Sequence, residues 1–202
     1  ARKLERKAKH FLWGALGLIL SSKPPPSLPL NFASTYSVLI IRPDRLGDVV
    51  LSTPVYESIK KSFPHLRVSV LVNQVNVSIL ADNPNIEEII SFDPKSPFGV
   101  IRQLRHKKFD IVFTLNKKFS ATASLLALIS KTKYRVGYAH DETAWLYDVR
   151  LPVDSPPRHE SLNNLELLRH VGITRTTEHP RLYFNEIEKK KIDHILKESR
   201  QH

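Results

Sequence analysis

The chain has 202 residues, of which 41% are hydrophobic and 25% are charged. This composition is typical of globular proteins and excludes a chain that is disordered or built mainly of membrane-spanning helices. Cysteine is absent, which excludes disulfide bonds and cysteine-ligated metal sites. Methionine is absent too and the chain begins with Ala1, so we expect a piece of a longer translated product. The length allows one α/β domain with appendages but not two complete doubly wound domains.

Positive charge is in excess and unevenly distributed. Lys and Arg number 31 against 20 Asp and Glu, which gives a net charge of +11, and the segment 111–140 contains no acidic residue. Such a field attracts phosphate-bearing partners: nucleic acid, anionic lipid headgroups or phosphorylated sugars. Aromatic residues do not interleave with the basic clusters and no RNA-binding or zinc-finger spacing occurs, so we expect no nucleic-acid partner.

Residues 1–30 form a separate segment. A basic stretch precedes an apolar run from Phe11 to Leu20, and a proline-rich stretch follows. The spacing predicts a basic amphipathic helix joined to the rest by a stiff linker, and the apolar run is too short to cross a bilayer. Three interpretations remain open: a helix lying on an anionic membrane surface, a helix docked on a protein surface, and a secretory signal peptide.

From residue 36 onward, apolar strand patterns alternate with helical patterns. This alternation predicts an α/β fold with a Rossmann-like parallel sheet and helices on both faces. The predicted strands are 37–42, 67–72, 89–92, 111–115 and 135–138, and the predicted helices are 48–62, 74–82, 97–107, 119–130 and 160–171. A further strand at 181–184 and a charged helix at 186–198 would begin a second unit. We therefore divide the chain into the segment 1–30, a Rossmann-like domain at 36–175, and a linker with the start of a second domain at 176–202.

The first predicted strand leads into a polar turn. Arg42, Asp44, Arg45, Gly47 and Asp48 lie there, where strand meets helix. Ligands of open α/β sheets bind beyond the carboxyl ends of the strands, so we expect these residues to face a ligand.

Several well-known site motifs are missing. No G-x-G-x-x-G, no G-x-x-x-x-G-K-[ST], no nucleophile elbow and no H-E-x-x-H occurs. These absences argue against dinucleotide and Walker-type phosphate binding, and we expect neither a cofactor nor a metal site.

Asp48 has two interpretations. It could cap the following helix, or it could act as a general base that takes a proton from an attacking hydroxyl group. Asp44 in the turn competes for the second role. Gly47 is explained either by a positive φ or by the close approach of a ligand.

The string I-R-P-D-R-L-G-D-V-V-L-S-T-P-V at 41–55, followed by S-F-P-H-L-R-V-S-V-L-V at 62–72, resembles the amino-terminal signature of glycosyltransferase family 9, the ADP-heptose:lipopolysaccharide heptosyltransferases. Later segments are similar in order and spacing: 109–113, Ser120, 134–138, His159 and 171–173. The resemblance covers about 36–184. The chain departs from it after the fourth strand, where Thr114-Leu115-Asn116-Lys117 replaces a D-x-Q-G-like turn.

The resemblance implies the amino-terminal, acceptor-binding half of a two-domain GT-B enzyme. Such enzymes work without metal, peripherally at the inner, cytoplasmic face of the cytoplasmic membrane, and transfer a heptose from an ADP-sugar to a lipopolysaccharide-type glycolipid acceptor. Asp48 falls on the catalytic base. The ADP-sugar would be held by the missing second domain, so this chain alone would be inactive. The implied acceptor-binding residues are Arg42, Asp44, Arg45, Gly47, Lys117, Lys118, Arg135 and His159.

A second reading comes from charge and fold alone. The chain could be a noncatalytic α/β module that binds anionic lipid or a phosphorylated glycan through a basic cleft. Under that reading, Asp48 would matter only as a helix cap.

Overall fold

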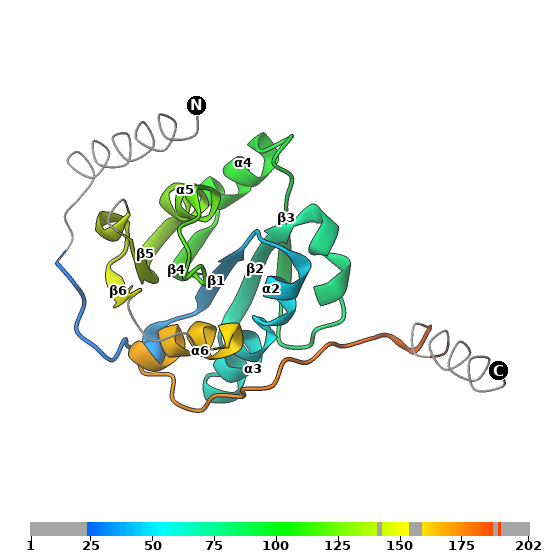
Figure 1. The fold of residues 1–202 in the computed structure, drawn as a ribbon. Helices are drawn as coiled ribbons and strands as arrows, with labels where there is room; N and C mark the ends of the chain where they lie inside the picture. Colours follow the sequence, from blue (N-terminus) through cyan, green and yellow to red (C-terminus); the bar gives the residue numbers. More distant parts are fainter. Residues whose placement is uncertain (1–23, 141–142, 154–158, 188–189, 191–202) are drawn as a thin grey trace.

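The computed structural model describes residues 24–140, 143–153, 159–187 and 190, which form one six-stranded parallel sheet with helices on both faces (Figure 1). The predicted α/β, Rossmann-like fold is thereby confirmed. The strands are β1 (Ser37–Arg42), β2 (Arg67–Asn73), β3 (Glu88–Phe92), β4 (Lys108–Thr114), β5 (Lys131–Ala139) and β6 (Val149–Pro152). The helices are α2 (Leu46–Val50), α3 (Thr53–Ser62), α4 (Phe98–His106), α5 (Ala121–Ile129) and α6 (Glu160–His170).

The strand order creates a switch point beside β1. The order is β3-β2-β1-β4-β5-β6, so the chain winds from β1 to one edge and then returns to place β4 on the other side of β1. Ile41 of β1 pairs with Thr114 of β4, and the chain leaves both strands at the same edge of the sheet. Loops that follow β1 and β4 turn to opposite faces, which opens the crevice where ligands of such sheets bind.

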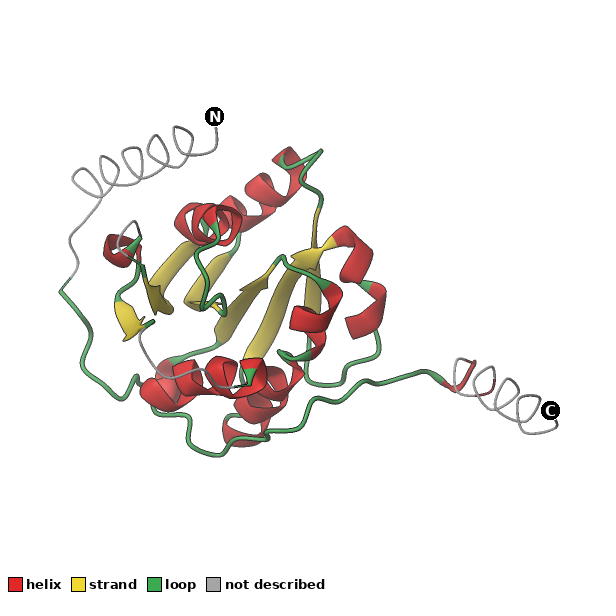
Figure 2. Cartoon of the chain, in the orientation of Figure 1, coloured by secondary structure: helices red, strands yellow, loops and turns green. Residues whose placement is uncertain are grey.

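Two helical layers bury the two faces of the sheet (Figure 2). Val38 and Ile40 of β1 lie in the core under α3 and α6, while Leu39 and Ile41 lie in the core under α4 and α5. All four side chains are fully buried. A strand that is covered on both faces is apolar at every position, and this explains the continuous run V-L-I-I in the sequence.

The single helix predicted over 48–62 is in fact two helices, α2 and α3. Pro54 lies in the first turn of α3 and has no N–H to donate to the carbonyl group of Val50. The hydroxyl group of Thr53 donates to that carbonyl oxygen instead, at 2.9 Å. The prediction was wrong here because the proline breaks the hydrogen-bond ladder without interrupting the apolar pattern.

The prediction of one helix at 74–82 was also wrong, because the structure has short 3-10 turns there. Two short 3-10 turns occupy this region, Gln74–Asn76 and Ser78–Leu80. The Asn73 side chain accepts a hydrogen bond from the Val75 backbone N–H and starts the first turn. Further short 3-10 turns lie at Phe32–Ser34 and Ala144–Leu146.

Two differences concern the ends of the sheet. Strand β6 was not predicted, although Val149 and Leu151 are buried and alternate with the exposed Arg150 and Pro152, because four residues carry too weak a signal. The predicted strand at 181–184 is absent, because this segment has no regular secondary structure; the Arg181 backbone N–H donates to the Thr53 hydroxyl oxygen of α3 instead. The predicted amphipathic helix lies outside the described residues, as does most of the charged helix at 186–198.

Candidate functional site

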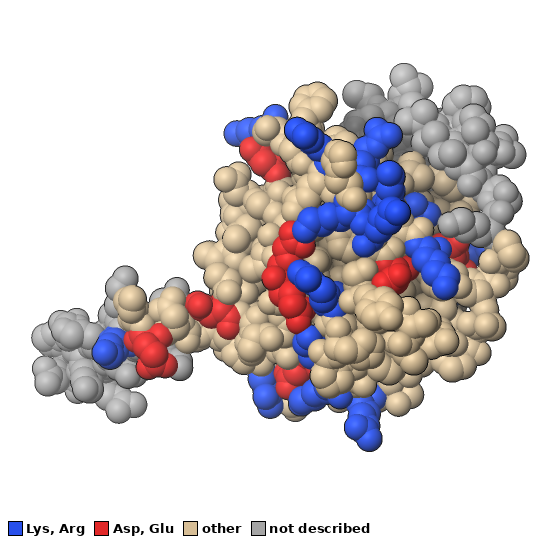
Figure 3. Space-filling view, turned by 180° about the vertical axis from the view of Figure 1, so that it is seen from behind, with Lys and Arg blue, Asp and Glu red and all other residues tan. Residues whose placement is uncertain are grey.

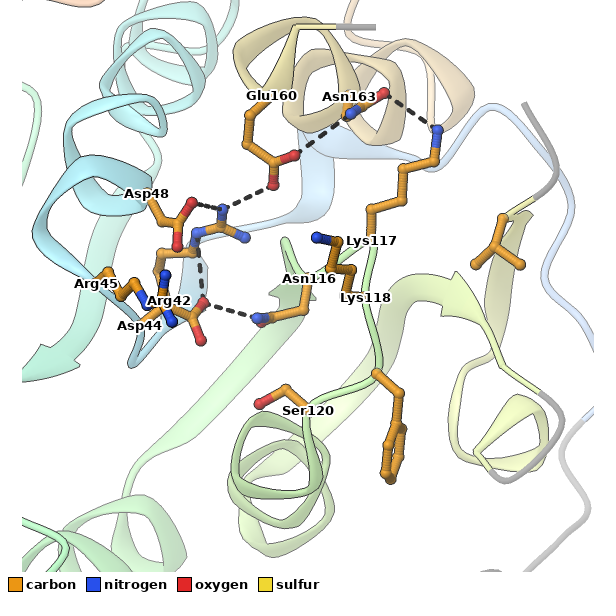
Figure 4. Close-up of a pocket in the computed structure, with 12 residues that line it drawn as sticks. Arg42, Asp44, Arg45, Asp48, Asn116, Lys117, Lys118, Ser120, Glu160 and Asn163 are labelled. Atoms are coloured by element: carbon orange, nitrogen blue, oxygen red, sulfur yellow. Dashed lines mark hydrogen bonds and ion pairs between the residues drawn. The ribbon is translucent and has the colours of Figure 1, made fainter. Parts of the chain in front are cut away.

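A cavity of about 820 Å³ opens at the carboxyl edge of the sheet, at the switch point between β1 and β4 (Figure 4). Four parts of the chain line it: the end of β1 with the following turn and the start of α2, the loop after β4, the residue after β6, and the start of α6. The lining residues are Arg42, Asp44, Arg45, Asp48, Asn116, Lys117, Lys118, Phe119, Ser120, Val153, Glu160 and Asn163.

The Arg42 guanidinium group forms the floor of this cavity and is only 2% exposed. Its Nη1 donates to the Leu115 carbonyl oxygen at 2.8 Å, and its Nη2 donates to Glu160 Oε1 at 2.8 Å. These two bonds offset part of the cost of burying a charged group, and they join β1, the loop after β4 and α6 at one point. The third donor, Nε, has no hydrogen-bond partner among the described residues.

Two more carboxylates approach the same guanidinium group. Asp44 Oδ2 lies 3.5 Å from Arg42 Nε, and Asp48 Oδ1 lies 3.5 Å from Arg42 Nη2. The Asn116 side-chain amide donates to Asp44 Oδ2 at 2.7 Å, and the Asn76 amide donates to the Asp44 carbonyl oxygen at 2.8 Å. Two side-chain amides thus hold Asp44 in place, one through its carboxylate and one through its backbone carbonyl group.

Asp48 is held more loosely. Its side chain is 37% exposed, lies in the first turn of α2 and faces the cavity. Within the described part of the chain, no backbone N–H of α2 donates to its carboxylate, so the capping interpretation finds no support in the geometry. A partly exposed carboxylate that faces a cavity, beside one buried cation, can accept a proton from a bound hydroxyl group.

Cationic side chains lie around these carboxylates. Arg45, Lys117 and Lys118 line the cavity, and Lys117 Nζ donates to Asn163 Oδ1 at 3.4 Å. The cavity therefore combines fixed carboxylates with cations that can pair with anionic groups of a ligand.

Lys and Arg side chains also gather over the upper part of the face that Figure 3 shows, with a short run of Asp and Glu near its middle.

Arg135 does not line this cavity, contrary to its predicted place in the acceptor cleft. Its Nε donates to the Ala127 carbonyl oxygen at 2.8 Å and its Nη2 to the Ser130 carbonyl oxygen at 3.1 Å, so it satisfies the carboxyl end of α5. Burial lowers the pKa of the Arg135 guanidinium group, and the charge of Asp148 partly offsets that effect.

His159 and Gly47 also lie outside the cavity lining. His159 is the residue before α6, and its Nδ1 lies 2.7 Å from Ser161 Oγ. Gly47 lies within α2 and is not among the glycines with positive φ, so that explanation of Gly47 was wrong. A Cβ atom at Gly47 would meet nothing within 4 Å, which leaves room for a ligand.

Sequence reasoning missed Glu160 and Asn163, which α6 brings to the cavity. Glu160 lies 118 positions beyond Arg42 of β1. Glu160 and Asn163 are three residues apart and so lie on one face of the helix, but nothing in that spacing predicts a polar partner. Asn116 and Phe119 could have been found, because the loop after β4 must meet the turn after β1 once the strand order is known.

Among the described residues, no group of three or more His, Asp and Glu side chains could hold a metal ion. No helix in the same part of the chain is long and apolar enough to cross a membrane.

Comparison with known proteins gives consistent relatives, although no family model matches the chain. Lipopolysaccharide heptosyltransferase 3 of Escherichia coli is 29% identical over 108 residues, which is 49% of this chain and 32% of that protein. The lipopolysaccharide core heptosyltransferase OpsX of Haemophilus influenzae is 27% identical over 155 residues, 73% of this chain and 44% of that protein. The crystal structure of a family 9 glycosyl transferase from Veillonella parvula superposes with a TM-score of 0.70 at 22% identity, covering 81% of this chain and 50% of that chain.

These similarities confirm the resemblance that the sequence predicted: the chain is like the family 9 heptosyltransferases in sequence and fold. It spans less than half the length of these two curated relatives.

Proposed function

We propose that this heptosyltransferase-like chain is the acceptor-binding half of a glycosyltransferase that moves a heptose or a related sugar from an ADP-sugar to a lipopolysaccharide inner-core acceptor. The ADP-sugar would be held by a second domain outside this chain, and no metal ion would take part. The enzyme would work at the inner face of the cytoplasmic membrane, where its glycolipid acceptor is anchored.

One observation carries the proposal. A partly exposed carboxylate, Asp48, faces a cavity at the switch point of a parallel sheet. The chain's relatives are named as lipopolysaccharide heptosyltransferases, and the reaction of such an enzyme needs a base for a sugar hydroxyl. The other carboxylates of the cavity are less suited, because Asp44 and Glu160 already accept close hydrogen bonds from Asn116 and Arg42.

In the proposed chemical step, Asp48 is the only base that is needed. The acceptor hydroxyl oxygen attacks the anomeric carbon of the donor sugar while its proton passes to the Asp48 carboxylate. The bond between the anomeric carbon and the phosphate oxygen breaks, and ADP leaves with the electron pair. Arg45, Lys117 and Lys118 would pair with phosphate or carboxylate groups of the acceptor and hold its hydroxyl in line.

The test is Asp48→Asn in the full-length protein that contains this chain. Asparagine keeps the size of the side chain but cannot take the proton, so turnover of ADP-heptose with a heptose-deficient lipopolysaccharide acceptor should fall at least ~100-fold. Asp82→Asn is the matched control, because Asp82 is exposed and lies outside the cavity lining. Unchanged turnover in Asp48→Asn would refute the base assignment, whereas no turnover in the wild-type protein would favour the noncatalytic reading.

A further inference from the structure

The buried guanidinium group of Arg42 lies at different distances from the carboxylates around it. Nη2 makes a 2.8 Å hydrogen bond to Glu160 Oε1 but lies 3.5 Å from Asp48 Oδ1. The first distance is that of a charge-assisted hydrogen bond, and the second is an ion pair without one. Nη2 carries two N–H groups, but of these two carboxylates only Glu160 lies close enough to accept a hydrogen bond from it.

We propose that Glu160 is a positioning residue for Asp48: by holding Nη2 of Arg42, it keeps the guanidinium group from closing on the Asp48 carboxylate. Asp48 then stays free to take the proton of a bound hydroxyl group. The inference rests on the proposed role of Asp48 as the base.

The Arg42 side chain has little freedom to satisfy both carboxylates. It is 2% exposed, and its Nη1 is fixed on the Leu115 carbonyl oxygen. The planar guanidinium group therefore presents Nη2 in one narrow range of directions. Removal of Glu160 leaves Asp48 as the carboxylate nearest to Nη2.

Glu160 is itself held in place by the fold. It is the first residue of α6, where the helix dipole favours a carboxylate, and its Oε2 accepts a hydrogen bond from the Asn163 amide at 3.4 Å. Leu165 and Leu168 anchor α6 in the core. The position of α6 thereby determines, through Glu160 and Arg42, how close the guanidinium group comes to the Asp48 carboxylate.

The first experiment compares crystal structures of the wild-type chain and Glu160→Ala. The distance from Arg42 Nη2 to Asp48 Oδ1 should shorten from 3.5 Å to that of a charge-assisted hydrogen bond, about 2.8 Å. A distance that stays at its wild-type value would overturn the proposal. Glu160→Ser, which also cannot reach Arg42, replaces the alanine variant if that variant does not fold.

The second experiment measures turnover in the full-length protein. Glu160→Ala should lower kcat at least ~10-fold, as expected when a reacting group is misplaced, while KM for the acceptor stays within ~3-fold. Glu160→Gln keeps an oxygen that accepts from Nη2 and should retain most of the wild-type kcat. Equal losses in the Gln and Ala variants, or a large rise in KM with kcat unchanged, would contradict a positioning role.

The matched control is Glu178→Ala, which removes another 2.8 Å bond between a carboxylate and an arginine, here Arg169, on the surface. It should change neither the Arg42 geometry nor the turnover. The two proposals fail separately: unchanged turnover in Asp48→Asn refutes the base, whereas the crystallographic distance tests Glu160 whatever Asp48 does.

Discussion

Replacement of Arg42 by methionine tests how far the cavity depends on one buried cation. Arg42→Met removes hydrogen bonds to Leu115 and Glu160 and leaves three carboxylates without their shared partner. Loss of one member of a buried ion pair costs ~3–5 kcal/mol. The carboxylates keep between 23% and 37% of their exposure and can regain water, so we expect a loss near ~3 kcal/mol, the lower end of that range.

Urea denaturation of the 202-residue chain measures this loss as a difference in the free energy of unfolding. For a chain of this size, ~3 kcal/mol corresponds to a fall in Tm of about 6–12 °C. The control is Arg169→Met, which breaks a surface ion pair and should cost less than ~1 kcal/mol. If Arg42→Met costs no more than this control, the guanidinium group does not hold the three elements together.

Three further predictions concern the core and the donor. Gly137→Ala should lower the free energy of unfolding, measured in urea, by ~1–3 kcal/mol, because a Cβ atom there would meet the Tyr147 ring at 2.5 Å. Gly99→Ala has open space around its Cβ atom and should stabilise α4 by ~0.5–1 kcal/mol. Burial raises the pKa of Tyr56 to about 12, so its contribution to stability is complete below pH ~10 and is lost as the pH rises towards 12. Between pH 10 and pH 12, the free energy of unfolding should fall by about 2 kcal/mol more in the wild type than in Tyr56→Phe. Calorimetry should find no micromolar ADP-heptose affinity for this chain, and such an affinity would contradict a separate donor domain.

Local patterns predicted the fold well where one strand or helix carries its own signal. The continuous apolar run of β1 is readable because a central strand is buried on both faces. The break between α2 and α3 was missed because Pro54 lacks an N–H for the Val50 carbonyl group and the Thr53 hydroxyl group donates there instead, without altering the apolar spacing. Strand β6 was missed because its stability comes from pairing with β5 and not from its own four residues.

The candidate site was predictable from the turn after β1 and in part from the loop after β4, where Lys117 and Lys118 were predicted and line the cavity, but not from α6. Arg42, Asp44, Arg45 and Asp48 follow one strand, and a rule about strand ends is enough to point to them. The bond between Arg42 and Glu160 joins residues 118 positions apart, and no sequence spacing encodes which helix start will cover the cavity. A buried arginine at a strand end is nevertheless a clue, because its donors need partners that the local sequence does not supply.

Arg135 gives the sharpest test of geometry against sequence reasoning. Similarity to the family places it in the acceptor cleft, whereas its guanidinium group donates to the Ala127 and Ser130 carbonyl oxygens at the end of α5. Arg135→Met should therefore cost ~1–3 kcal/mol of stability, since it leaves those carbonyl groups without their charged donor. In the full-length protein, KM for the acceptor should stay within about 3-fold of wild type, because Arg135 does not line the cavity. Lys118→Met, which changes a cation of the cavity lining, should show the reverse pattern of raised KM and unchanged stability. A raised KM in Arg135→Met with normal stability would place this arginine at the acceptor and show that α5 does not need it.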